Sequence, residues 1–301
     1  LAYEQALILQ PALPEGMLAR GVLHYYLRDF EAAEPDLTTS VSLLPNNSQA
    51  YLWLGSMRRR QGRWQEAAAL LERAASIEPD STDYLWSLCQ TYNALRNREA
   101  QERAIRRARA ANPDDMASAM WQAWLPMQYD GDLEGLVLTL EQLRARISVD
   151  RIGQQPIDIS VLSNLAWAYH SQGRFQEAAA VLESIPVAFF EPGNREADIG
   201  WAYRDAGDLQ AAREWFESAL MKLEGVDADR FSIDSVTRMV LIRAFALAGL
   251  GHSDEAVKLA REAHMQIPRS KDEIAWWINS MMTASFLAQI GDNEGAIKLI
   301  G

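Results

Sequence analysis

One fixed spacing constrains the fold of this chain more than any other feature. Four prolines recur at one constant interval, namely Pro11, Pro45, Pro79 and Pro113. Each comes at the close of a segment whose apolar residues have helical spacing, and the next segment repeats the pattern. A constant interval of about 34 residues is typical of units that stack on their neighbours. Because proline also stops a helix, the sequence predicts an array of helix-turn-helix units with this repeat length.

Composition and charge narrow the functional classes. Of the 301 residues, 49% are hydrophobic, which is enough for a continuous core, and the formal net charge is -12. That charge repels phosphate groups, so no nucleic acid partner is expected. No apolar run approaches the roughly 18 residues of a membrane span, so no membrane insertion by this segment is expected. The compartment stays open, with the cytoplasm slightly favoured over the periplasm.

The clearest unit runs from Ser48 to Pro79. Gly55 and Ala67 are small where the two helices of a hairpin are expected to cross closely, and Gly62 suits a left-handed turn between them. Larger side chains fill the space on either side, namely Tyr51, Leu54, Trp64 and Leu71. The segment Gln61 to Glu72 (QGRWQEAAALLE) recurs as Gln172 to Glu183 (QGRFQEAAAVLE), which indicates internal duplication.

The turn glycine also recurs to the end of the chain, as Gly131, Gly173, Gly207, Gly251 and Gly291. In most of the second half its spacing exceeds the interval between the prolines. We therefore predict one array over residues 1–301, with about eight hairpins and half-repeats at both ends. The repeats are regular over 1–115 and carry insertions over 116–301, near 147–159, 223–234 and 269–272.

By these residues the chain resembles the tetratricopeptide repeat (TPR) family over essentially its whole length. The resemblance implies an all-α, right-handed superhelical solenoid of helix-turn-helix repeats. The run from Arg59 through Asp132 is also similar to the C-terminal repeat regions of bacterial multidomain signalling proteins. Those proteins carry a cyclase, kinase or winged-helix output domain, and the chain begins and ends inside a repeat. We therefore expect a fragment of a longer polypeptide.

In the family, the fifth and ninth positions of each first helix point into a concave groove. Carried across to this chain, those positions predict five partner-binding aromatic residues: Trp86, Trp124, Trp167, Trp201 and Phe245. Met281 adds apolar bulk at another fifth position. Such a trough would suit an extended peptide or a helix. The alternative is that these aromatic side chains pack between neighbouring hairpins as core.

Two arginine groups offer other surfaces. One lies at a single hairpin turn (Arg58, Arg59, Arg60 and Arg63), and the other lies along a later second helix (Arg103, Arg106, Arg107 and Arg109). Guanidinium groups would suit an acidic segment or a carboxylate. The ordinary interpretation is a solvated face paired with nearby glutamates, as the spacing of Glu99 and Arg103 suggests.

The residues of catalytic and metal sites are not grouped in this sequence. The four histidines fall in different repeats, so neither a metal nor a cofactor is expected. The single cysteine, Cys89, takes the small-residue position equivalent to Gly55, which predicts an inert buried thiol.

The sequence therefore predicts a non-catalytic protein-interaction scaffold that binds a peptide or protein segment on its concave face. The alternative is the regulatory or sensor module of a multidomain bacterial signalling enzyme or transcription regulator. A homodimer through the terminal half-repeats is a further possible assembly.

Overall fold

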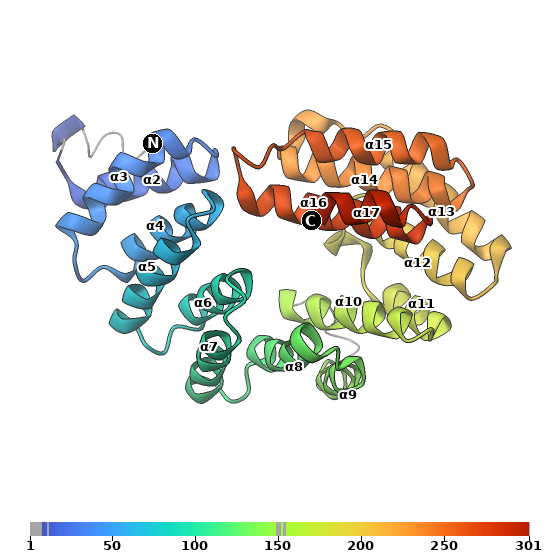
Figure 1. Ribbon diagram of the computed structural model, residues 1–301, viewed down its shortest axis with the longest axis horizontal. Helices are drawn as coiled ribbons and strands as arrows, with labels where there is room; N and C mark the ends of the chain where they lie inside the picture. Colours follow the sequence, from blue (N-terminus) through green and yellow to red (C-terminus); the bar gives the residue numbers. More distant parts are fainter. Residues whose placement is uncertain (1–7, 11, 149–151, 153–154, 301) are drawn as a thin grey trace. The chain divides into compact units, whose positions relative to one another are not determined.

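The computed structural model describes residues 1–301 except 1–7, 11, 149–151, 153–154 and 301 (Figure 1). Within the described residues the regular elements are all helices, with no strand. The chain divides into two compact units. Unit 1 comprises Leu1–Leu125 with Ser270–Ile274, and unit 2 comprises Pro126–Arg269 with Ala275–Gly301.

Unit 1 consists of antiparallel helix pairs in chain order. They are α2 (Pro14–Tyr26) with α3 (Phe30–Leu43), α4 (Ser48–Arg60) with α5 (Trp64–Ile77), and α6 (Thr82–Ala94) with α7 (Arg98–Ala111), followed by the start of α8 (Met116–Asp130). Pro45, Pro79 and Pro113 each come shortly after the last residue of a helix. The helix stops predicted from these three prolines are confirmed, and Pro11 lies outside the described residues.

Unit 2 holds the rest of α8 and the helices that follow. They are α9 (Leu133–Arg144), α10 (Pro156–Ser171), α11 (Phe175–Ser184), α12 (Asn194–Asp205), α13 (Leu209–Leu223), α14 (Ile233–Gly249), α15 (Ser253–Met265), α16 (Glu273–Gln289) and α17 (Asn293–Ile300). Two short 3₁₀ segments, η2 (Val187–Phe189) and η3 (Ala228–Arg230), lie between them.

The longer glycine spacing of unit 2 corresponds partly to longer first helices. Helices α10, α14 and α16 have 16, 17 and 17 residues, whereas α2, α4 and α6 have 13 each. The segment predicted as an insertion near 147–159 is helical from Pro156 onwards, and residues 149–151 and 153–154 lie outside the described part. The segment near 223–234 contains η3, and 269–272 lies between α15 and α16.

The turns inside the hairpins share one backbone device, a residue in the left-handed region. The predicted glycines take this conformation, with φ of 72° at Gly62 and positive values at Gly131, Gly173, Gly207, Gly251 and Gly291. One repeat length before and after Gly62, the same turn position holds Arg28 and Arg96, with φ of 60° and 54°. In several turns the next residue caps the following helix by accepting a backbone N–H with its side chain, as at Asp29, Asn97, Asp132, Asp208 and Asp292.

Small residues let the helices approach closely. A methyl group at Gly55 would lie 3.0 Å from Leu71 Cγ and 3.4 Å from the Ala67 carbonyl oxygen, which confirms the predicted close crossing of α4 and α5. In unit 2 the fully buried ring of Phe216 lies against two glycines. Methyl groups there would lie 2.6 Å from the ring at Gly200 and 2.2 Å from it at Gly249. Hairpin stacking in unit 2 therefore depends on this ring having glycine beside it.

Candidate functional site

The five predicted aromatic residues fall on first helices of hairpins and are divided between the two units. Trp86 on α6 and Trp124 on α8 belong to unit 1. Trp167 on α10, Trp201 on α12 and Phe245 on α14 belong to unit 2. Each unit therefore has an aromatic set of its own.

In unit 2 the aromatic residues differ sharply in exposure. Trp201 is only 4% exposed, and its indole Nε1 donates a hydrogen bond to the Phe245 carbonyl oxygen at 3.3 Å. Its ring packs edge to face on Phe216, while Phe245 packs on Phe286 with ring centroids 5.1 Å apart. Trp201 thus lies in the core between hairpins, which is the packing alternative left open by the sequence. Trp167 is 45% exposed, so its indole presents apolar surface to solvent.

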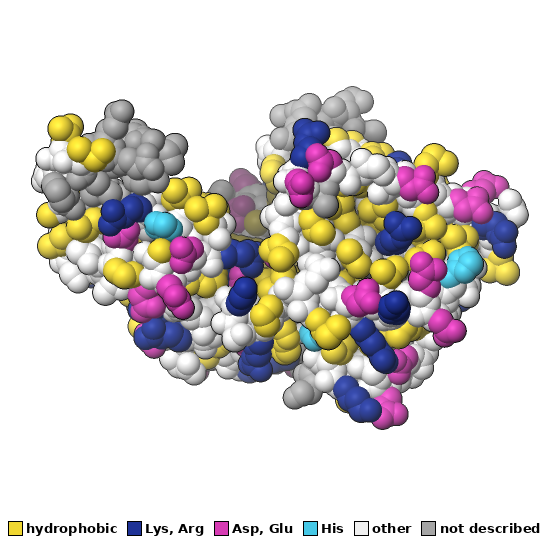
Figure 2. Space-filling model, turned by 90° about the horizontal axis from the view of Figure 1, so that it is seen from above, with side chains coloured by type: hydrophobic (Ala, Val, Ile, Leu, Met, Phe, Trp, Pro, Cys, Tyr) yellow, Lys and Arg dark blue, Asp and Glu magenta, His cyan; other side chains and the backbone are white. Residues whose placement is uncertain are grey.

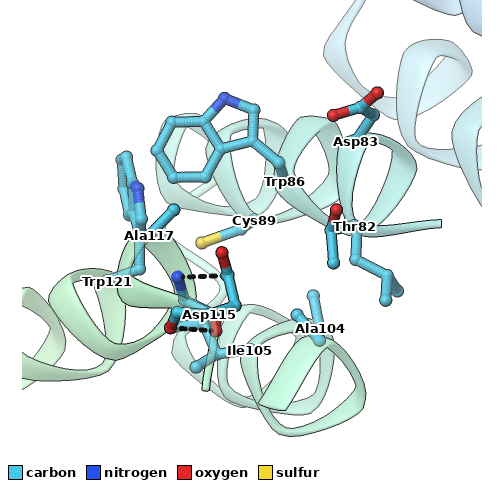
Figure 3. Close-up of a pocket in the computed structure, with 12 residues that line it drawn as sticks. Thr82, Asp83, Trp86, Cys89, Ala104, Ile105, Asp115, Ala117 and Trp121 are labelled. Carbon is cyan, nitrogen blue, oxygen red and sulfur yellow. Dashed lines mark hydrogen bonds between the residues drawn. The ribbon is translucent and has the colours of Figure 1, made fainter. Parts of the chain in front are cut away.

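In unit 1, Trp86 is half-buried and forms a pair with Trp121 of α8. Their ring centroids lie 4.0 Å apart with the planes at 82°, an edge-to-face arrangement. Next to the pair is a cavity of about 280 Å³ between α6, α7 and α8. Figure 3 shows both indoles, the Cys89 thiol and Asp115 around this space. Trp124 lies one turn further along α8 and is half-buried.

The cavity has an apolar interior and a polar rim. Leu85, Ile105 and the two indoles supply the apolar surface. Thr82 and Asp83 come from the first turn of α6, while Asp115 and Ser118 come from the start of α8. Asp115 Oδ2 accepts the Ser118 backbone N–H at 2.7 Å and so caps α8. Within the described residues, no hydrogen bond or ion pair engages the Thr82 hydroxyl or the Asp83 carboxylate, so both can contact a ligand.

Cys89 lies at the inner end of the cavity. Its thiol accepts a weak hydrogen bond from Gln101 Nε2 at 3.7 Å. Burial raises the pKa of this thiol to about 11, so it stays protonated at neutral pH. The predicted inert character of the thiol agrees with this environment, because a nucleophilic cysteine needs a lowered pKa.

Two tryptophans at these surfaces were missed by the sequence reasoning, which considered only the fifth and ninth helix positions. Trp121 stands two repeat lengths after Trp53, and Trp53 packs on Tyr25 in its own hairpin stack. This recurrence of tryptophan in one register was the available signal. Trp277 on α16 is 52% exposed, and Met281, one turn later, is 38% exposed.

The arginine groups are only partly a solvated face. Arg63 pairs with Glu66 at 2.6 Å and Arg103 pairs with Glu99 at 2.6 Å, both on the surface. For Arg58 that interpretation is wrong, because its guanidinium is buried and lies 2.6 Å from Glu34 Oε1 of the preceding hairpin. Arg59 donates to Gln90 Oε1 at 2.8 Å, and burial lowers the pKa of its guanidinium. These arginines tie successive hairpins together.

Other kinds of site were sought in the described part of the chain. No group of three or more His, Cys, Asp or Glu side chains there is arranged to hold a metal ion. Among its helices, none is both long and apolar enough to cross a membrane. On the face in Figure 2, acidic and basic side chains are interspersed among hydrophobic ones.

The repeats seen in the structure are also found by comparison with known sequences. Sequence models described as tetratricopeptide repeat match residues 18–82, 58–125, 159–184 and 197–221, together more than half of the chain. The chain belongs to the tetratricopeptide repeat family. Proteins of this family and fold are typically non-catalytic.

Individual relatives are more distant. Cellulose synthase operon protein C of Xanthomonas axonopodis pv. citri (strain 306) is 28% identical over 256 residues, which cover 79% of this chain and 16% of that protein. The yeast Tom70 structure has a TM-score of 0.62 at 11% identity and covers 99% of this chain and 60% of its own. A tetratricopeptide repeat protein from Parabacteroides merdae ATCC 43184 has a TM-score of 0.58 at 14% identity, covering 88% and 98%. The structural likenesses show the fold, and the chain spans less than two thirds of both the curated relative and Tom70.

Proposed function

We propose that this TPR chain is a protein-interaction scaffold that binds a peptide or protein segment along the first helices of its hairpins, on their concave side. The family supports this role, because TPR hairpins are a fold for binding proteins rather than for catalysis. The net charge of -12 favours a protein partner over a nucleic acid.

The observation that carries the proposal is unfilled or exposed aromatic surface on first helices in both units. Trp86 borders an open cavity in unit 1, and Trp167 leaves nearly half of its surface in water in unit 2. Tryptophan is among the side chains that most often dominate protein interfaces, because a covered indole buries a large apolar area. Trp124 extends this surface on α8. Trp201 and Phe245 support the unit 2 surface from within the core.

A peptide-display selection against the intact chain tests the proposal, with the affinity of selected peptides measured by calorimetry. We expect Trp86→Ala or Trp167→Ala to weaken each peptide at least about tenfold, according to which unit it binds. Phe189→Ala is the matched control, because Phe189 is equally exposed but lies on η2 outside the first helices. Failure to select any binder, or equal affinity for all three variants, would contradict the proposed function.

The sensor-module alternative and the homodimer stay predictions. A ligand-dependent change in the output of the full-length protein tests the first of them. Light scattering of the purified chain tests the second, with twice the 33.8 kDa monomer mass expected for a dimer.

A further inference from the structure

The cavity in unit 1 has a counterpart one repeat earlier, and there the equivalent space is filled. Tyr84 on α6 is 3% exposed. Its hydroxyl donates to Ser48 Oγ at 3.0 Å, at the start of α4. Ser48 in turn donates to a carboxylate oxygen of Glu78, in the loop after α5. A phenol ring with a satisfied hydroxyl therefore closes the junction between the α4/α5 hairpin and α6.

At the next junction the ring is missing. One repeat length after Tyr84 the chain has Ser118, and one repeat length after Ser48 it has Thr82. Both line the cavity of about 280 Å³. Replacing tyrosine with serine at one register position removes a phenol ring, whereas the hydroxyl that would meet that ring is kept in Thr82. The cavity is thus the Tyr84 site of the next repeat without its ring.

The cavity walls suit an aromatic occupant. Trp86 and Trp121 stand nearly perpendicular to one another beside it, so an incoming ring can meet an indole face or edge. Its volume lies just below the roughly 300 Å³ at which pockets for small molecules usually begin, so it suits one side chain better than a cofactor. The charged groups around it are Asp83 and Asp115 on the rim and Arg109, whose Nη1 donates to the Asp115 carbonyl oxygen.

We propose that this cavity receives one tyrosine side chain of a bound protein segment, with its ring against Trp86 and Trp121 and its hydroxyl donating to Thr82 Oγ1. The inference rests on the proposed scaffold function and names the residue that the unit 1 surface selects. The two rim carboxylates disfavour an anionic side chain, so phosphorylation of that tyrosine prevents binding.

The direct test uses the intact chain labelled with ¹⁵N-tryptophan and the probe N-acetyl-tyrosine methylamide. We expect saturable shifts of the Trp86 and Trp121 indole N–H signals, assigned by Trp86→Phe and Trp121→Phe. The phenylalanine and leucine analogues should bind several-fold more weakly, and the O-phosphotyrosine analogue should cause no shift. Thr82→Val should reduce the preference for tyrosine over phenylalanine to less than twofold. Tighter binding of a lysine or leucine probe would overturn the proposal.

A pair of variants at one position sharpens the test. Ser118→Tyr supplies the missing ring from within the chain and should abolish the probe-dependent shifts. Ser118→Ala leaves the cavity open and should keep them. Should Ser118→Tyr fail to fold, the rate of thiol modification in the wild type replaces it, because Cys89 is the one cysteine of the chain and lies in the cavity. Saturating tyrosine probe should slow that rate at least about twofold. An unchanged rate would overturn the proposal.

The same variants separate this inference from the proposed function. Peptides selected on the wild type that bind Ser118→Tyr with unchanged affinity would leave the scaffold function standing and remove the tyrosine site. A chain that selects no peptide would remove the scaffold function. In that case, saturable binding of the tyrosine probe would still support the cavity as a tyrosine-binding site.

Discussion

The two units are built from the same hairpin and differ in how their aromatic residues are used. In unit 2, Trp201, Phe216, Phe245 and Phe286 form a closed chain of ring contacts, and glycines give Phe216 room. In unit 1, Trp86 and Trp121 make a ring contact beside an open cavity. One fold therefore accommodates aromatic side chains as sealed core in one unit and as available surface in the other. The difference is set by the residues opposite each ring.

The largest effect is expected at the closed core of unit 2. Phe216→Ala removes a fully buried ring and should lower the free energy of unfolding by about 3–5 kcal/mol. Urea denaturation followed by circular dichroism measures this loss. The exposed Phe189→Ala should change stability by less than about 0.5 kcal/mol. Similar losses in the two variants would mean that Phe216 is not the centre of that core.

Glycine-to-alanine changes in the two units compare how tightly each is packed. A methyl group at Gly249 would lie 2.2 Å from the rigid Phe216 ring, so Gly249→Ala should cost about 1–3 kcal/mol. A methyl group at Gly55 meets Leu71 Cγ at 3.0 Å, and that flexible side chain can yield. Gly55→Ala should therefore cost less. The order of the two midpoints in urea decides the matter, and the reverse order would show unit 1 to be the tighter.

The hairpin turns provide a pair of changes with opposite signs. Arg96 holds a left-handed conformation that favours glycine, so Arg96→Gly should stabilise the chain by about 0.5–1 kcal/mol. Gly173→Ala introduces the same strain in unit 2 without any steric contact, because nothing lies within 4 Å of the added methyl group. It should destabilise by about 1 kcal/mol. Thermal unfolding of both variants tests this, and two shifts of the same sign would contradict it.

The smallest effect is confined to alkaline pH. Burial raises the pKa of Cys89 from 9.0 to about 11, so the unfolded chain releases this proton first as the pH rises. The stability of the wild type relative to Cys89→Ala should thus be constant below pH 9 and fall between pH 9 and about 11. Urea midpoints of both proteins at each pH provide the measurement. A difference that stays flat across this window would mean that the thiol is not buried in the folded state.

Much of the fold could be predicted from the sequence because its signals are local. Pro79 ends a helix and Gly62 takes a left-handed turn through their own backbone preferences, whatever lies nearby. The close crossing at Gly55 was also predictable, because a missing side chain in a fixed register indicates contact. Arg28 and Arg96 at two turns were not, since arginine carries no such preference and is held there by the flanking helices.

The binding surfaces were less predictable. Trp167 and Trp201 are separated by one repeat length and share a register position, yet one is half exposed and the other is buried. Exposure depends on what the adjacent hairpin places opposite the ring, and Phe216 and Phe245 cover Trp201. The same reason explains Arg58, which is buried because Glu34 of another hairpin reaches it.

The sequence by itself determined the period, the helix stops, the turn residues and the small positions where helices cross. These follow from backbone conformation and from residue size at fixed spacing. Only the tertiary structure decided which aromatic residues are core and which border open space, and that Ser118 leaves the space that Tyr84 fills one repeat earlier. Such facts depend on contacts between hairpins, where the burial of each side chain is set by residues distant in the chain.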